Sequence, residues 1–264
     1  GLANVRIGEN AGDAIASGTN YNVVVGNEAG TNLNGGDSNV FVGYKAGEAA
    51  TTGGSNTAVG YHALKTEDGN GTNVAVGTGA LDAQTSGGDS NTAVGHFTLS
   101  ENTTGDNGVA IGYNALNANT TGGSNTAVGH SALREVTTAS KNTAVGRSAA
   151  ANISTSHNVT ALGWYALADV TGSGVNESVF IGAEAGRYAD SADKSVCIGF
   201  KAGKSITGGD DFVAVGYQAL GTSSGVTGQS CTAVGAFALE DNTSGEHNTG
   251  IGKGSLQQNT TGDK

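Results

Sequence analysis

The chain has 264 residues, with 46 glycines, no proline, two cysteines and a formal net charge of −11. Twelve basic residues against 23 acidic ones argue against nucleic acid as a partner, because binding to phosphates needs clustered lysine and arginine. Two cysteines exclude a disulfide scaffold, and the lack of any run of about eighteen apolar residues predicts no membrane insertion in this segment.

A short motif ending in glycine recurs along the whole chain. It reads NVRIG at 4–8, NVVVG at 22–26 and NVFVG at 39–43, then NTAVG at 56–60, and it ends with NTGIG at 248–252. The motif glycines are almost evenly spaced. Ten of the fourteen spacings have the same length, which is that from Gly26 to Gly43, and the other four are one or two residues longer. The sequence therefore predicts one continuous repeat array over residues 1–264, from Gly8 to Gly252, which we expect to be a slice of a longer fibre protein.

Each repeat predicts one strand, with positions counted from the motif glycine as zero. Position −1 is always Val, Ile or Leu, and position −3 is always Val or Thr, which favours a strand of about five residues. Because position −2 is mostly Ala, we expect both faces of the strand to be buried, with the Thr residues at −3 facing inward. The recurring residues include the position −1 side chains Val59, Val76, Val94, Ile111, Val128 and Val145.

The motif glycine itself predicts a backbone requirement. A glycine at a fixed position of every repeat is needed for positive φ or for close approach to a neighbouring backbone. We expect Gly129→Ala or Gly146→Ala to destabilise the array. The central motif glycines are Gly60, Gly77, Gly95, Gly112, Gly129 and Gly146.

Positions −2 and +4 vary together in volume. Phe41 at −2 goes with Gly47 at +4, and Phe180 goes with Gly186. Where −2 is Ala, as at Ala58, position +4 is generally Leu, as at Leu64. This pattern indicates a shared packing site, either within one turn or between chains.

A single repeat is too short to bury its own apolar face, so the repeats must stack on one another. The sequence predicts an all-β fold, a parallel β-roll (β-solenoid) of about fifteen repeats. Asn at position −4 in nine repeats predicts a ladder of side-chain amides along the stack. A second apolar face on each strand favours assembly of two or three copies around an axis.

The repeats also resemble known families. SVFIGAEAG at 178–186, SVCIGFKAG at 195–203 and the NTAVGxxAL units resemble the head repeats of YadA-like trimeric autotransporter adhesins. NTAVGYxAL followed by NTTG is similar to repeats of bacteriophage tail fibres. The resemblance implies a left-handed, trimeric β-roll that is extracellular, on a virion tail or a bacterial cell surface, and works in attachment. The repeat of this chain is longer than that of the adhesin heads, which favours the fibre type.

Residues with catalytic or metal-binding chemistry are scattered. His62, His96 and His130 lack metal-ligand spacing, and Asp37, Asp89 and Asp210 lie in glycine-rich loops typical of turns rather than calcium sites. Carboxylates such as Glu67 and Asp68 are expected to be solvated loop residues, Cys197 to be a buried filler and Cys231 to replace a ladder Asn. The sequence predicts no enzyme activity, no catalytic residues, no cofactor and no metal site.

Aromatic residues recur at position +1, directly after the motif glycine. They include Tyr61, Tyr113, Trp164 and Tyr217, and they predict either a surface stripe for a receptor or glycan or a contact between subunits. The function expected is a structural and adhesive module of a homotrimeric extracellular fibre, with a cell-surface glycan or protein as a further partner. The alternatives are a self-assembling filament subunit, a β-solenoid that binds glycan or ice, and a glycan-cleaving fibre enzyme. Ice binding is disfavoured by the inward Thr residues expected at −3.

Overall fold

The computed structural model describes residues 3–69, 71–85, 87–171, 174–221 and 225–263. In these residues the fold is all-β without a helix, and it contains fifteen strands of three residues each. The chain divides into two units, residues 1–138 and 139–264, which are described separately. Consecutive strands pair in parallel in both units, so the prediction of a parallel β-solenoid with one strand in each repeat is confirmed.

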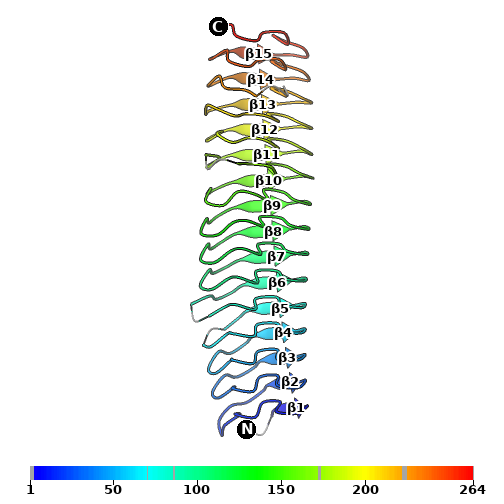
Figure 1. The fold of residues 1–264 in the computed structure, drawn as a ribbon, viewed down its shortest axis with the longest axis vertical. Helices are drawn as coiled ribbons and strands as arrows, with labels where there is room; N and C mark the ends of the chain where they lie inside the picture. The colour runs from blue at the N-terminus through cyan, green and yellow to red at the C-terminus, as the bar shows by residue number, and fades with distance from the viewer. Residues whose placement is uncertain (1–2, 70, 86, 172–173, 222–224, 264) are drawn as a thin grey trace. The chain divides into compact units, whose positions relative to one another are not determined.

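The first unit holds eight strands stacked in chain order (Figure 1). The motifs align in register, so that Val24 lies opposite Phe41 and Phe41 lies opposite Ala58. Each position of the repeat therefore forms a column along the stack. The strands are β1 (Val5–Ile7), β2 (Val23–Val25), β3 (Val40–Val42), β4 (Thr57–Val59), β5 (Val74–Val76), β6 (Thr92–Val94), β7 (Val109–Ile111) and β8 (Thr126–Val128).

The second unit repeats this arrangement with seven strands. Here Ala161 lies opposite Phe180, and Phe180 lies opposite Cys197. The strands are β9 (Thr143–Val145), β10 (Thr160–Leu162), β11 (Val179–Ile181), β12 (Val196–Ile198), β13 (Val213–Val215), β14 (Thr232–Val234) and β15 (Thr249–Ile251).

The strands are shorter than the five residues that the motif predicts. Two backbone bends limit each one. In the turn around β4, Ser55 at position −5 has φ of +61°, and Gly60 at position zero has φ of +139°. Both values lie outside the extended region, so only positions −3 to −1 keep strand geometry.

In β2 to β15, only one face of the strand is fully buried within the chain. The middle residue, position −2, is buried in β2 through β15, whereas positions −1 and −3 are half-buried or exposed. The expectation that both faces are buried is therefore wrong for a single chain, and the Thr residues at −3 face outward rather than inward. The cause is simple alternation: with −2 in the core, its two neighbours must point away from it.

The rest of the core comes from the turn after the glycine. Position +3, usually Ala, and position +4, mostly Leu or Gly, are buried in both units except in the last repeat, where Leu256 is exposed. Position +7 forms a third buried column that the repeat pattern did not predict, because it mixes apolar residues such as Leu33, Val136 and Ile153 with polar ones such as Gln84. Positions +2 and +4 both adopt left-handed φ, as at His62 (+57°) and Leu64 (+50°), which folds the turn back over the strand.

Candidate functional site

The outward strand face of each unit is a regular row of β-branched and aliphatic residues. It consists of the residues at positions −1 and −3, which we call the outward strand row. Ile111 is 40% exposed and Val145 is 41% exposed, although both are large apolar side chains in regular strands. Monomeric proteins rarely leave such a contiguous row in contact with water. Of the residues singled out from sequence, it contains Val59, Val76, Val94, Ile111, Val128 and Val145.

The aromatic residues at position +1 lie on the surface and stack along the columns of the first unit. Tyr44 and Tyr61 stack with ring centroids 5.4 Å apart. Tyr113 stacks between His96 and His130, at 5.4 and 5.1 Å. The two histidine rings are thus separated by a tyrosine ring, and this column is a packed aromatic ladder rather than a pair of metal ligands.

In the second unit the aromatic column has a different arrangement. Tyr217 stacks on Phe200 at 5.3 Å, and Phe237 meets Tyr217 edge-on at 5.2 Å. Trp164 packs edge-on against Tyr165 at 4.6 Å and remains 47% exposed. A tryptophan ring this exposed on a rigid turn offers a flat apolar surface to a ligand.

The paired packing sites meet within a single turn of the solenoid. A Cβ placed on Gly47 would lie 2.8 Å from ring carbons of Phe41, and one on Gly186 would overlap the ring of Phe180. These glycines also have left-handed φ, +59° and +58°. Where −2 is Ala58, the freed space takes the buried side chain of Leu64. The sequence left open whether these positions meet within a turn or between chains, and the geometry assigns them to the same turn.

The motif glycines form a column in which neighbouring backbones touch. A Cβ on Gly60 would lie 2.5 Å from the carbonyl oxygen of Gly77 in the next turn. Real Cβ atoms do not approach a backbone atom so closely, and the positive φ adds strain for any other residue. Positive φ between +129° and +140° is shared by Gly60, Gly77, Gly95, Gly112, Gly129 and Gly146.

The asparagines at position −4 form a ladder in which each side chain bonds to backbone groups of the next turn. The Oδ1 of Asn39 accepts a hydrogen bond from the backbone N–H of Asn56 at 2.8 Å, and its Nδ2 donates to the carbonyl of Gly53 at 2.9 Å. The same Oδ1-to-N–H contact links Asn22 to Asn39. The predicted ladder therefore exists mainly as side chain to backbone bonds between turns.

Replacing Asn39 by alanine tests this ladder. Because Asn39 is fully buried, the change leaves the N–H of Asn56 without its acceptor. We expect a loss of about 2 kcal/mol in the free energy of unfolding, measured by denaturant titration. Asn39→Ser is the matched control, since Ser178 accepts from the N–H of Ser195 at the same position elsewhere. Equal losses in both variants would contradict the account.

The true side-chain ladder lies at position +7 instead. Gln84 donates to the carboxylate of Glu67 at 2.8 Å, Asn102 donates to Gln84 at 3.3 Å, and Asn119 donates to Asn102 at 2.8 Å. The expectation that Glu67 is solvated is wrong, because it is fully buried, while its neighbour Asp68 is exposed. The hydrogen-bonded amides of the ladder offset the cost of burying this polar column.

The loop aspartates act as turn residues. The carboxylate of Asp37 accepts the backbone N–H of Asn20 at 2.7 Å, and that of Asp210 accepts the N–H of Asp193 at 3.1 Å. Asp89 bonds Gly71 in the same way at 3.1 Å. Each carboxylate thus ties its turn to the preceding one. No group of three or more His, Cys, Asp or Glu side chains gathers as metal ligands among the described residues.

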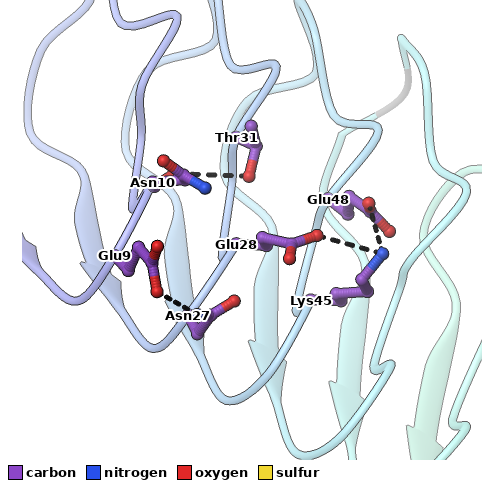
Figure 2. Close-up of polar contacts among 7 residues, drawn as sticks. All are labelled: Glu9, Asn10, Asn27, Glu28, Thr31, Lys45 and Glu48. Carbon is purple, nitrogen blue, oxygen red and sulfur yellow. Dashed lines mark hydrogen bonds and ion pairs between the residues drawn. The ribbon is translucent and has the colours of Figure 1, made fainter.

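A small cluster of polar side chains lies on the turns that follow β1, β2 and β3 (Figure 2). The Lys45 ammonium lies 3.0 Å from Glu28 and 2.9 Å from Glu48, and these two carboxylates raise the pKa of Lys45. Asn27 donates to Glu9 at 3.1 Å. Such partly exposed ion pairs add little to stability. The contact of Lys45 with Glu28 joins consecutive turns, whereas its contact with Glu48 lies within one turn.

The two cysteines are free and buried, in agreement with the interpretation of Cys197 as a filler. Burial raises the pKa of the Cys197 thiol to about 12, so its reactive thiolate is not populated near neutral pH. Cys231 occupies the ladder position and donates to the carbonyl of Gly245 at 3.2 Å. Burial also raises the pKa of Cys231.

Neither the models of known protein families nor the curated proteins compared with the chain match it. No helix long and apolar enough to cross a membrane occurs in the described part of the chain. The outward strand row and the aromatic column at position +1 are the surfaces that bear on function.

Proposed function

We propose that this chain is a structural and adhesive module of a homotrimeric extracellular fibre, in a virion tail or on a bacterial cell surface. In this proposal the β-roll is left-handed and three copies wrap around one axis. The module carries no catalytic chemistry. It provides a stiff, repetitive shaft or head whose loops face outward and contact a cell-surface glycan or protein.

The outward strand row is the observation that carries the proposal. It presents Val, Ile, Leu or Thr at two positions of every strand, and the columns are in register along each unit. Burial of apolar surface contributes about 25 cal/mol for each Å² removed from water, so a row this long favours association. Closed rotational symmetry is the ordinary way for identical chains to cover the same face on each copy.

The native mass of the dilute protein tests the trimer. The expected result is a single species of three chain masses. A stable monomer would contradict the proposal. A mass that grows with concentration would instead support the filament alternative, in which arrays stack end to end through open sheet edges.

Ile111→Glu provides a second test of the outward strand row. The side chain is 40% exposed in the single chain, so a carboxylate there leaves the folded turn intact but is costly to bury between chains. We expect the trimer to dissociate into folded monomers, seen by native mass and circular dichroism. Thr121→Glu, at an exposed loop position, is the matched control and should remain trimeric. A trimeric Ile111→Glu protein would place the contact elsewhere.

A second candidate function follows from the corrected orientation of position −3. Thr126 and Thr160 belong to parallel strands and face outward beside a Val or Leu at position −1. Outward, regularly spaced Thr residues are the feature that an ice-binding solenoid requires. Thermal hysteresis of the purified protein would favour this function over the fibre module.

A further inference from the structure

Two asparagine–glycine pairs of the first unit differ in how their backbone nitrogens are held. The chain contains three such pairs, at Asn34, Asn70 and Asn107, and Asn70 lies outside the described residues. An asparagine before a glycine loses its side-chain amide more readily than other asparagines, because glycine has no side chain to shield its own backbone nitrogen. In a folded chain the reaction depends on what binds that nitrogen.

The pair formed by Asn34 and Gly35 is open to solvent. Both residues are exposed in the loop between β2 and β3, and a Cβ on Gly35 would meet nothing closer than Thr52, at 3.6 Å. The N–H of Asn34 donates to the carbonyl of Thr51 at 2.8 Å. In contrast, neither the N–H of Gly35 nor the side-chain amide of Asn34 has a hydrogen-bond partner among the described residues. No hydrogen bond therefore holds the Gly35 nitrogen away from the Asn34 side chain.

The pair formed by Asn107 and Gly108 is closed. Gly108 is buried at position −4, and its N–H donates to Oδ1 of Asn91 at 2.7 Å as part of the position −4 ladder. A Cβ on Gly108 would lie 2.9 Å from the same oxygen, so the backbone of Gly108 is packed against its acceptor. Attack by this nitrogen first requires the buried hydrogen bond to open, which is a cost that Gly35 does not have.

We infer that Asn34 is a site of spontaneous deamidation in the folded protein, whereas Asn107 is protected. The backbone nitrogen of Gly35 loses its proton and forms a bond to Cγ of Asn34, which closes a succinimide ring. The bond from Cγ to Nδ2 breaks, and that nitrogen takes up the proton and leaves as ammonia. Water then opens the ring at either carbonyl and leaves aspartate or isoaspartate. One water is consumed and one ammonia is released, with no oxidation or reduction.

The turn holds both ends of the reacting pair in place. Leu33 before it is fully buried, and the carbonyl of Gly36 after it accepts a hydrogen bond from Nδ2 of Asn22 at 3.0 Å. The extra backbone carbon of isoaspartate must then be accommodated within the exposed loop, and we expect the fold to be retained. The product carries one more negative charge than the −11 of the unmodified chain. The change is irreversible, accumulates with time and does not depend on the proposed fibre function.

Peptide mapping of the aged native protein tests the inference. The protein is incubated at mildly alkaline pH, digested at intervals and analysed by mass spectrometry, and isoaspartate is detected with a protein isoaspartyl methyltransferase. We expect progressive loss of the amide at Asn34 and a rate at Asn107 that is at least about tenfold lower. Equal rates at the two residues, or an unchanged Asn34, would overturn the inference.

The same incubation in denaturant shows whether the fold causes the difference. Unfolding removes the hydrogen bond between Gly108 and Asn91, so the two asparagines should then react at similar rates. If Asn107 stayed tenfold slower in the unfolded chain, the neighbouring sequence rather than the position −4 ladder would protect it, and the structural argument would fail.

Two substitutions and a pH series identify the route. Asn34→Gln keeps an exposed amide but requires a larger ring, so it is expected to stop the reaction in this loop, while the matched variant Asn107→Gln leaves the rate at Asn34 unchanged. The rate at Asn34 should rise with pH, because the Gly35 nitrogen must lose its proton before it attacks. A rate that does not depend on pH in the alkaline range would contradict attack by this nitrogen.

Discussion

Replacing Gly60 by alanine is expected to lower the free energy of unfolding by about 3–5 kcal/mol. The new Cβ would lie 2.5 Å from the carbonyl oxygen of Gly77 and 2.7 Å from its carbonyl carbon. Neither atom can move without breaking the register of the following turn. The φ of +139° adds strain, because side chains other than glycine rarely adopt it. Thermal and denaturant unfolding both measure the loss.

Gly35→Ala separates the two contributions to that loss. Gly35 belongs to the same unit and has a similar φ of +126°, but the nearest atom to its Cβ, in Thr52, is 3.6 Å away. It therefore carries the backbone strain without the collision between turns, and we expect a loss of only about 1–2 kcal/mol. Equal losses at the two positions would mean that close packing of the glycine column contributes nothing.

The repeat pattern predicted the columns of the fold because each column repeats one physical constraint. Glycine at position zero, a β-branched residue at −3 and the volume exchange between −2 and +4 recur with little variation. Parallel stacking brings equal positions together, so an internal alignment already contains the contacts between turns. Strand positions and the packing pairs could be read in this way.

The direction of each face could not be read from the same pattern. Val59 and Ala58 are both apolar, and the pattern therefore predicted that both strand faces would be buried. The structure fully buries only Ala58 and leaves Val59 half-buried, because neighbours of a core residue in a strand point away from the core. The buried column at position +7 was not predicted from sequence for a related reason. Leu33, Glu67 and Gln84 occupy the same position of their repeats but have different side-chain chemistry, so no pattern marks the position as buried.

The aromatic column could be read from sequence only in part. Position +1 was recognised as an aromatic stripe, and the structure places these rings on the surface, where rings of consecutive turns stack. The basic side chains that lie over the rings come from positions +1, +2 and +5 of different turns, which only the folded chain brings together.

A double-mutant cycle on Phe180 and Gly186 tests the packing rule of the core. Phe180→Ala removes a fully buried ring and is expected to cost about 3–5 kcal/mol. Gly186→Leu drives a side chain into that ring and is expected to cost about 3 kcal/mol or more, since the φ of +58° adds a further penalty.

The double variant Phe180→Ala with Gly186→Leu is expected to recover most of both losses. It recreates the arrangement of Ala58 and Leu64, in which a leucine with φ of +50° fills the space above an alanine. The remaining cost of about 1 kcal/mol reflects the left-handed leucine, and the coupling free energy should exceed about 2 kcal/mol. Denaturant unfolding of the four proteins measures it. Additive losses would show that the two side chains do not fill the same space. The co-variation of side-chain volume at positions −2 and +4 would then have to arise from a contact with another turn or another chain.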